Sequence, residues 1–165
     1  MAGLALILSA GPVQAAGLKT LPAHVPETIS RLHLQPIGSL AATKQLNLAI
    51  GLPLHNQEEL TNLLQQVYDP ASPLYHHFLT PQQFTERFGP SEQDYAAAIA
   101  FARTNGFAVT GTHDSRMVLD VSAAVSDVER AFHVKMRLYQ HPTENRTFFA
   151  PDAAPSVGAA ALAAG

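Results

Sequence analysis

The sequence contains no cysteine and has few charges of either sign. Without cysteine the chain has no disulfide bonds, no thiolate nucleophile and no cysteine ligands for zinc or iron–sulfur clusters. The formal net charge is -3, and the 10 lysines and arginines are scattered along the chain. Because no basic surface is available to attract phosphate backbones, we expect no nucleic-acid partner.

The sequence also lacks a long hydrophobic run. The apolar run at residues 4–8 is far too short to span a membrane, so we expect no membrane partner. Residues 13–15 match the small-residue rule of a signal-peptidase site, although no lysine or arginine precedes the apolar run. We therefore expect residues 1–16 to be a truncated signal peptide of a secreted protein, with an ordinary disordered tail as the alternative.

With 165 residues, the chain is long enough for one domain with a hydrophobic core. Residues 17–42 carry three prolines without sustained periodicity, which predicts an extended N-terminal arm. The domain is expected at 43–150. The alanine-rich residues 151–165 are typical of a linker.

Hydrophobic periodicity predicts an alternation of strands and helices. Alternating apolar residues predict strands at 44–54, 107–112, 116–122, 134–140 and 146–150. Apolar residues at helical spacing, with capping signals, predict helices at 57–68, 81–88, 92–104 and 125–132. This order predicts an α+β fold, a ferredoxin-like split βαβ sandwich with an antiparallel sheet and its helices on one face.

One stretch, DPASPLYHHFLTPQQFTERFGPS at residues 69–91, combines prolines, aromatic residues and two adjacent histidines. Thr80-Pro81-Gln82-Gln83 predicts a capped helix start, and the prolines before it predict an extended segment. Because neighbouring side chains of an extended segment point to opposite sides, His76 and His77 cannot easily share a metal ion, and no metal site is expected.

The chain resembles the activation prodomain of the sedolisin, or serine-carboxyl peptidase, family of the pro-kumamolisin type. The residues that carry the resemblance are DPASPLYHHFLTPQQFTERFGPS, the GFAV and RMVLDV strands and the VERAFH helix. They match the family pattern in order and spacing, within residues 46–150.

This resemblance implies a propeptide of a secreted peptidase, which assists folding, inhibits the enzyme and is removed by self-cleavage at acidic pH. The cognate catalytic domain would be the partner, and residues 151–165 would lead toward it. That domain would carry the catalytic serine, glutamate and aspartate and a calcium site, so this chain is expected to have no cofactor and no enzymatic activity. The alternative is a free-standing ferredoxin-like interaction module, or an inhibitor acting in trans.

No catalytic constellation is expected within the chain itself. Gly111-Thr112-His113 has histidine where a Gly-Thr-Ser nucleophile turn of the family needs serine. His113, Asp114 and Ser115 belong to one tight turn, so they cannot converge as base, orienter and nucleophile.

A ferredoxin-like sheet leaves one face free to pack on a partner. On the last long strand the residues expected there are His133, Lys135, Arg137 and Tyr139, with Val118 and Asp120 beside them. Alternation alone also predicts a solvated polar face, which is the alternative. Together with Tyr75, His76 and His77 they are the predicted contacts with the peptidase.

The C-terminal part is expected to run toward the peptidase active site as a tethered substrate. The residues singled out in this exit segment are Phe148, Phe149, Pro155 and Leu162. Histidine gains its charge between about pH 7 and pH 5, so histidines at the interface would weaken it in acid. The candidates are His76, His77, His133 and His141, with ordinary surface histidines as the alternative.

Overall fold

The computed structural model describes residues 17–158, which form an α+β fold and confirm the predicted class. Its helices are α1 (Glu27–Arg31), α2 (Gln57–Tyr68), α3 (Pro81–Phe88), α4 (Glu92–Thr104) and α5 (Val125–Phe132). Its strands are β1 (Leu18–Thr20), β2 (Gly38–Ser39), β3 (Gln45–Gly51), β4 (Ala108–Thr112), β5 (Val118–Ala124), β6 (Met136–Gln140), β7 (Thr147–Pro151) and β8 (Ser156–Gly158). No helix in this part of the chain has the length and hydrophobicity needed to cross a membrane.

The central sheet has the strand order β3-β5-β4, and both outer strands are antiparallel to β5. The predicted hairpin of β4 and β5 is confirmed. Because β3 and β4 run parallel with β5 between them, and α2, α3 and α4 connect them, this region is a split βαβ unit. The sequence therefore predicted this half of the sheet correctly.

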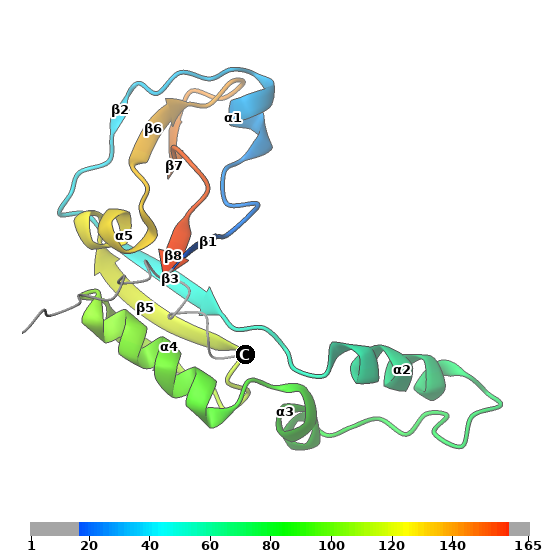
Figure 1. Cartoon of the computed structure of the whole chain (residues 1–165). Coiled ribbons are helices and arrows are strands. Elements are labelled where there is room, and N and C mark those ends of the chain that lie inside the picture. Colours follow the sequence, from blue (N-terminus) through cyan, green and yellow to red (C-terminus); the bar gives the residue numbers. More distant parts are fainter. Residues whose placement is uncertain (1–16, 159–165) are drawn as a thin grey trace, which may run out of the picture.

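The other half of a ferredoxin-like sheet would place β6 beside β3, and this detail is not seen. β6 pairs instead with β2 and β7 in a separate sheet (Figure 1). Residues 38 and 39 of the N-terminal arm pair with residues 138 and 137, so β2 provides the backbone partner that β3 would have given. The expected proximity of β6 to Val118 and Asp120 is therefore wrong.

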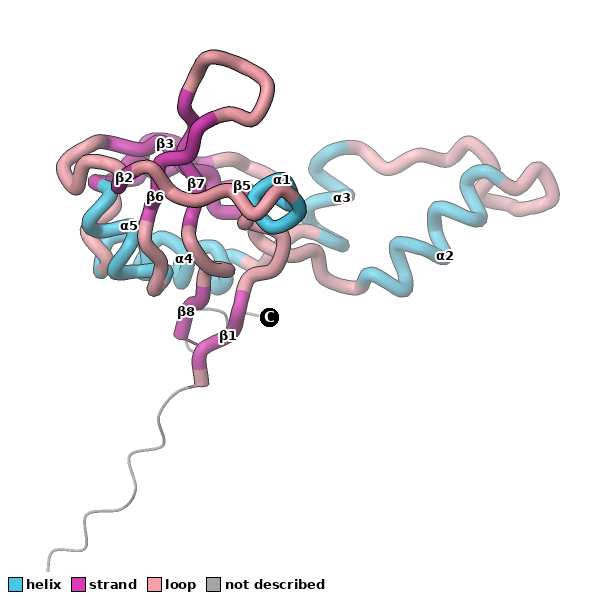
Figure 2. The backbone as a smooth tube through the Cα atoms, turned by 90° about the horizontal axis from the view of Figure 1, so that it is seen from above, coloured by secondary structure: helices cyan, strands magenta, loops and turns pink. Residues whose placement is uncertain are grey.

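The segment predicted as an extended arm carries β1, α1 and β2. β1 pairs with β8 in an antiparallel two-stranded sheet, with Leu18 opposite Gly158. The two ends of the described chain consequently lie side by side, as Figure 2 shows. Residues 151–158, predicted as part of a linker, are partly held in this strand pair.

The main core lies between the central sheet and two helices, α4 and α5 (Figure 1). Leu119, Val121 and Val125 are fully buried in it. The side chains of β3 that face it are Leu46, Leu48 and Ile50. Only α4 and α5 pack on this sheet, so the prediction of helices on one face holds for these two helices.

Helices α2 and α3 form a separate arm at residues 56–90, which projects from the sheet in both views (Figures 1 and 2). The α2–α3 arm has a small cluster of its own around Leu63, Val67 and Phe88. The Thr80 capping box of α3 is confirmed, with the Gln83 amide donating to Thr80 Oγ1 at 3.2 Å. The arm therefore folds on local signals and a few apolar contacts.

The segment from Asp69 to Phe78 forms turns, so the prediction of an extended segment is wrong. The side chains of Asp69 and Ser72 accept backbone hydrogen bonds from residues 71 and 74, at 2.9 and 3.1 Å. Short polar side chains of this kind stabilise turns. Asp69 itself keeps the extended conformation expected before proline, and the turns follow it. His76 has a positive φ of 59° and donates its N–H to the carbonyl of Val67.

Candidate interaction surfaces

The predicted contact residues lie on two separate parts of the molecule. Tyr75, His76 and His77 are in the turns that follow α2 in the α2–α3 arm. His133 and Lys135 lie between α5 and β6, and Figure 1 shows α5 at the end of the sheet away from the arm. The structure therefore does not bring the two groups into one site.

The turns of the arm carry stacked aromatic rings. The rings of Tyr75 and His76 lie 3.8 Å apart and nearly parallel, and the ring of Phe78 lies 6.1 Å from that of His76. Phe78 is 62% exposed and Tyr68, which contacts it edge-on, is 68% exposed. This surface offers stacking and apolar contact. Among residues 17–158, no group of three or more side chains is arranged to hold a metal ion.

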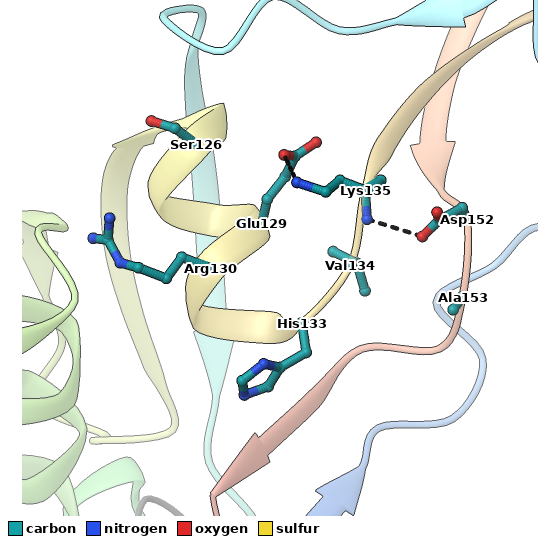
Figure 3. A pocket seen from close by; sticks show the side chains of 8 residues that line it. All are labelled: Ser126, Glu129, Arg130, His133, Val134, Lys135, Asp152 and Ala153. Atoms are coloured by element: carbon teal, nitrogen blue, oxygen red, sulfur yellow. Dashed lines mark hydrogen bonds and ion pairs between the residues drawn. The ribbon is translucent and has the colours of Figure 1, made fainter.

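A cavity of about 500 Å³ lies where α5 leads into β6 (Figure 3). On its wall, Glu129 accepts hydrogen bonds from Lys135 Nζ at 2.9 Å and from the Met136 amide at 2.8 Å. Asp152 accepts the Lys135 amide at 2.8 Å. Burial alone would raise the pKa of Glu129, but these hydrogen bonds and the charge of Lys135 lower it below its ordinary value. The carboxylate thus ties β6 to α5.

Strand β6 does not form the open sheet face that alternation predicted. Tyr139 is only 4% exposed, and its ring stacks on that of Phe148 at 5.5 Å. Arg137 donates to Ser39 Oγ at 2.8 Å and lies 3.9 Å from Asp152, which fastens β2 and the residues after β7 to β6. Of the four predicted contact residues, His133 and Lys135 are exposed, Arg137 is partly exposed and Tyr139 is buried.

The predicted exit segment is mostly part of the fold. Phe148 and Phe149 belong to β7, and Phe149, which is 44% exposed, has Lys44 Nζ 5.3 Å from its ring centre. The carbonyl of Pro155 accepts a hydrogen bond from the Leu21 amide at 2.7 Å. These three residues are therefore held by neighbouring strands. Leu162 lies outside the described residues.

The unoccupied sheet face is on β3, β5 and β4, opposite α4 and α5. We call this the open face and define it by Asn47, Ala49, Asp120 and Ser122, whose side chains point away from the core. These side chains are small, and a shallow depression of about 420 Å³ crosses the three strands. The sequence prediction included Asp120 in the free face, but it took most of that face from β6 because it placed β6 in this sheet.

A histidine that the sequence had shown only as part of a turn is bonded to the open face. Nε2 of His113 lies 2.8 Å from Oδ2 of Asp120, and both side chains are partly exposed. The His113 amide also donates to the Tyr95 hydroxyl at 3.0 Å. A β-bulge shifts the β4 register between Val109 and Gly111. A Cβ at Gly111 would lie 2.9 Å from the Asp120 carboxylate, so glycine is what allows this close approach.

The carboxylate of Asp94 lies where the α2–α3 arm meets the core. Asp94, only 6% exposed, accepts hydrogen bonds at Oδ2 from the Ser91 hydroxyl at 2.7 Å and the Ser91 amide at 3.0 Å. Nε2 of His55 lies 2.9 Å from the same oxygen. The Ser91 hydroxyl above all, with the Ser91 amide and His55, lowers the pKa of Asp94 against the opposing effect of burial.

Sequence reasoning found one part of this cluster and missed another. The spacing of Ser91 and Asp94 predicted their capping box, which is confirmed. Asn56 was expected to cap α2, but it has a left-handed φ of 51° and donates its side-chain amide to the Arg87 carbonyl at 3.1 Å. The α2–α3 arm is thus joined to itself and to α4 by contacts between distant residues, for which the sequence carries no signal.

Comparison with known proteins gives a family for the chain. Residues 33–163 match the model of the "Pro-kumamolisin, activation domain" family. The chain is 31% identical over 117 residues to xanthomonalisin from Xanthomonas sp., covering 71% of this chain and 14% of that protein. It is 27% identical over 115 residues to sedolisin from Pseudomonas sp., covering 70% of this chain and 20% of that protein.

A fungal relative gives a similar result. Tripeptidyl-peptidase SED1 from Arthroderma otae is 28% identical over 104 residues, covering 62% of this chain and 16% of that protein. The chain therefore spans between 14% and 20% of the length of these three relatives. The resemblance noted in the sequence is confirmed by both kinds of comparison.

Proposed function

Because the chain belongs to the pro-kumamolisin activation-domain family, we propose that it acts as the propeptide of a secreted, acid-activated peptidase of the sedolisin type. The family match over residues 33–163 carries this proposal. An activation domain is a propeptide and not a catalytic domain, so the chain is not itself a peptidase. It assists folding of the cognate catalytic domain, holds that domain inactive and is removed by proteolysis at acidic pH.

The open face is the surface on which the catalytic domain packs. Its small side chains allow the backbone of a partner to approach closely, while the opposite face of the sheet is already covered by α4 and α5. A flat face of this kind can bury a large area without displacing long side chains. The exposed His133 and Lys135, and the aromatic turns at Tyr75, His76 and His77, stay predicted contacts outside this face.

Release of the propeptide in acid stays a prediction that rests on histidines among the contacts. Histidine ordinarily gains a proton between about pH 7 and pH 5, and an unpaired new charge in a contact that excludes water weakens that contact. His76, His77, His133 and His141 stay predictions as acid-sensitive groups.

The experiment that tests the proposal is an inhibition titration. The full chain is added to a purified sedolisin-type peptidase without its own propeptide, at about pH 6.5 and about pH 4. We expect tight inhibition at the higher pH that fades at the lower pH. Absence of inhibition at both pH values would overturn the inhibitory role and leave the alternative, an interaction module of the same fold.

Two matched variants locate the surface. Ser122→Arg places a long charged side chain in the middle of the open face and should abolish inhibition at the higher pH. Gln65→Arg adds the same side chain to an exposed position of α2 and should leave inhibition unchanged. His77→Gln, at an exposed predicted contact, tests the acid response, since it should keep inhibition at the lower pH. Equal inhibition by all three variants and the parent would show that docking occurs elsewhere.

A further inference from the structure

The outer edge of β3 has no strand beside it. β3 pairs only with β5, in a continuous register from Gln45 opposite Ala124 to Gly51 opposite Val118. Within residues 17–158, no other segment forms backbone or side-chain hydrogen bonds with this edge. Unpaired strand edges attract other strands because they present a row of free N–H and C=O groups.

The register identifies which backbone groups face outward. The Leu52 amide donates to the Met117 carbonyl at 2.9 Å, and the Val125 amide donates to the Lys44 carbonyl at 2.9 Å. Hydrogen bonding alternates along an antiparallel strand, so the even-numbered residues between Lys44 and Leu52 bond to β5. The N–H and C=O groups of Asn47, Ala49 and their odd-numbered neighbours therefore point away from the sheet.

An apolar trough lies beside this edge, on the side of the core. It consists of two neighbouring cavities of about 260 and 590 Å³, which share lining residues on β3 and α5. Its apolar lining includes Leu48, Ile50, Phe132 and Phe149. These volumes are in the range of sites for small ligands and short peptides.

Three basic side chains and one carboxylate line the trough, and the carboxylate is already hydrogen-bonded within the protein. Lys19, His24 and His55 line it, with Asp94, whose Oδ2 contacts His55 and Ser91. Lys19 therefore supplies a positive charge for a ligand. A peptide that fills the trough is favoured if it carries a carboxylate near one end.

We infer that the β3 edge and its trough bind an extended peptide segment, with apolar side chains at alternate positions and an acidic residue near one end. The segment adds a strand beside β3, where a ferredoxin-like sheet would have its fourth strand. Its residues opposite Asn47 and Ala49 form the hydrogen bonds. The residues between them direct their apolar side chains into the trough.

A second copy of the chain does not fit this site as well as a peptide. The apolar side chains of its β3, such as Leu46 and Leu48, already pack in its own core and cannot fill the trough. The other edge of the sheet is also different, since β4 has a β-bulge and Thr110 there has no register partner. Bulges protect an edge from pairing, whereas β3 is regular and uncharged from Gln45 to Gly51.

The probe is the peptide acetyl-Glu-Val-Thr-Val-Thr-Leu-Glu-amide, whose two glutamates serve either strand direction. It is titrated into the ¹⁵N-labelled full chain at about pH 6.5. We expect the amide signals of Asn47, Ala49 and Gly51 to shift and their hydrogen exchange to slow. The amides of Leu48 and Ile50 bond to β5 in the free protein, so their exchange should be slow before and after addition.

Two controls separate strand addition from simple apolar binding. The same peptide with N-methylated threonines keeps its side chains but loses the N–H groups that face β3, and it should not bind. Ala49→Pro removes an outward N–H without removing a bond to β5, and should weaken binding about tenfold. Thr112→Pro makes the same change on the other edge, where Thr112 lies opposite Leu119 and its N–H also points away from β5, and it should bind like the parent.

Three results would overturn the inference. The first is no shift at the β3 amides at about 1 mM peptide. The second is equal binding by the N-methylated peptide or by the Ala49→Pro variant, provided that its spectrum shows a folded protein. The third is a concentration-dependent shift of the same amides without peptide, which would show that two copies of the chain pair at this edge.

Discussion

The main core and the α2–α3 arm contain equally buried residues, but they differ in how many neighbours support them. Leu119 in the core and Phe88 in the arm are both 0% exposed. Leu119 lies on the central strand of a sheet, between two other strands and under α4 and α5. Phe88 packs in a cluster with only two other buried residues, Leu63 and Val67.

Burial alone therefore does not measure the local stability of this protein. The arm is fixed to the core at one end, where His55 donates its amide to the Phe88 carbonyl at 2.8 Å and its ring contacts Asp94. Regions with few apolar contacts open locally at a lower free energy than the whole protein. We therefore expect the arm to open while the central sheet stays folded.

The largest effect is expected in the main core. Leu119→Ala removes a large side chain from a fully buried position and leaves a cavity that the sheet cannot close. We expect a loss of about 2–5 kcal/mol in the free energy of unfolding, measured by urea denaturation. A loss below about 1 kcal/mol would show that the core around Leu119 is not tightly packed, and the contrast with the arm would fail.

A similar truncation in the arm should act locally. Phe88→Ala removes the ring that packs against Phe84, 5.6 Å away, and is expected to destabilise the arm by about 3 kcal/mol. Hydrogen exchange should then become fast in α2 and α3 and stay slow in β5. If exchange in β5 accelerated equally, the arm and the core would unfold as one unit and the comparison would fail.

Removing a helix cap should lower the free energy of unfolding less than these truncations do, and the loss should again differ between the core and the arm. Ser91→Ala removes the cap of α4, which packs on the central sheet, and should lower the free energy of global unfolding by about 1 kcal/mol. Thr80→Ala removes the equivalent cap of α3 in the arm. Its effect on the global urea midpoint should be smaller, because the arm can open separately. Equal shifts of the two midpoints would contradict this view.

The parts of the fold that were predicted correctly depend on neighbours in the sequence. The spacing of Thr80 and Gln83 and of Ser91 and Asp94 predicted both capping boxes, and Gly106 ends α4 with the expected positive φ of 82°. Alternation on β5 predicted its buried residues. In each case the interacting groups are a few residues apart, so local physics determines the outcome.

The parts that were missed depend on competition between distant segments. Gly38 and Ser39 have no sequence pattern typical of a strand, yet β6 pairs with them and not with β3. His55 and Asp94 are 39 positions apart, so no spacing rule relates them. The open face was misplaced for the same reason, because it follows from which strands pair. Strand composition predicts that a strand exists, but it does not select its partner.

The smallest expected effect is on the response to acid, and it tests whether the junction of arm and core depends on the Asp94 charge. The pKa of Asp94 is lowered in the folded protein, so its carboxylate stabilises the fold above the ordinary pKa of about 3.9. This stabilisation is lost as the pH falls through the lowered value. Asp94→Asn should therefore be less stable at neutral pH and lose less stability between about pH 5 and pH 2.

Glu144 provides the matched control for this titration. Its pKa is also lowered, chiefly by a hydrogen bond from Arg146, but both side chains are more than half exposed in the loop before β7. Solvent screens such a pair, so Glu144→Gln should change the acid response little. If the two variants gave the same pH profile in thermal unfolding, the Asp94 carboxylate would contribute no more than a surface charge. The arm would then be held to the core by its apolar and backbone contacts alone.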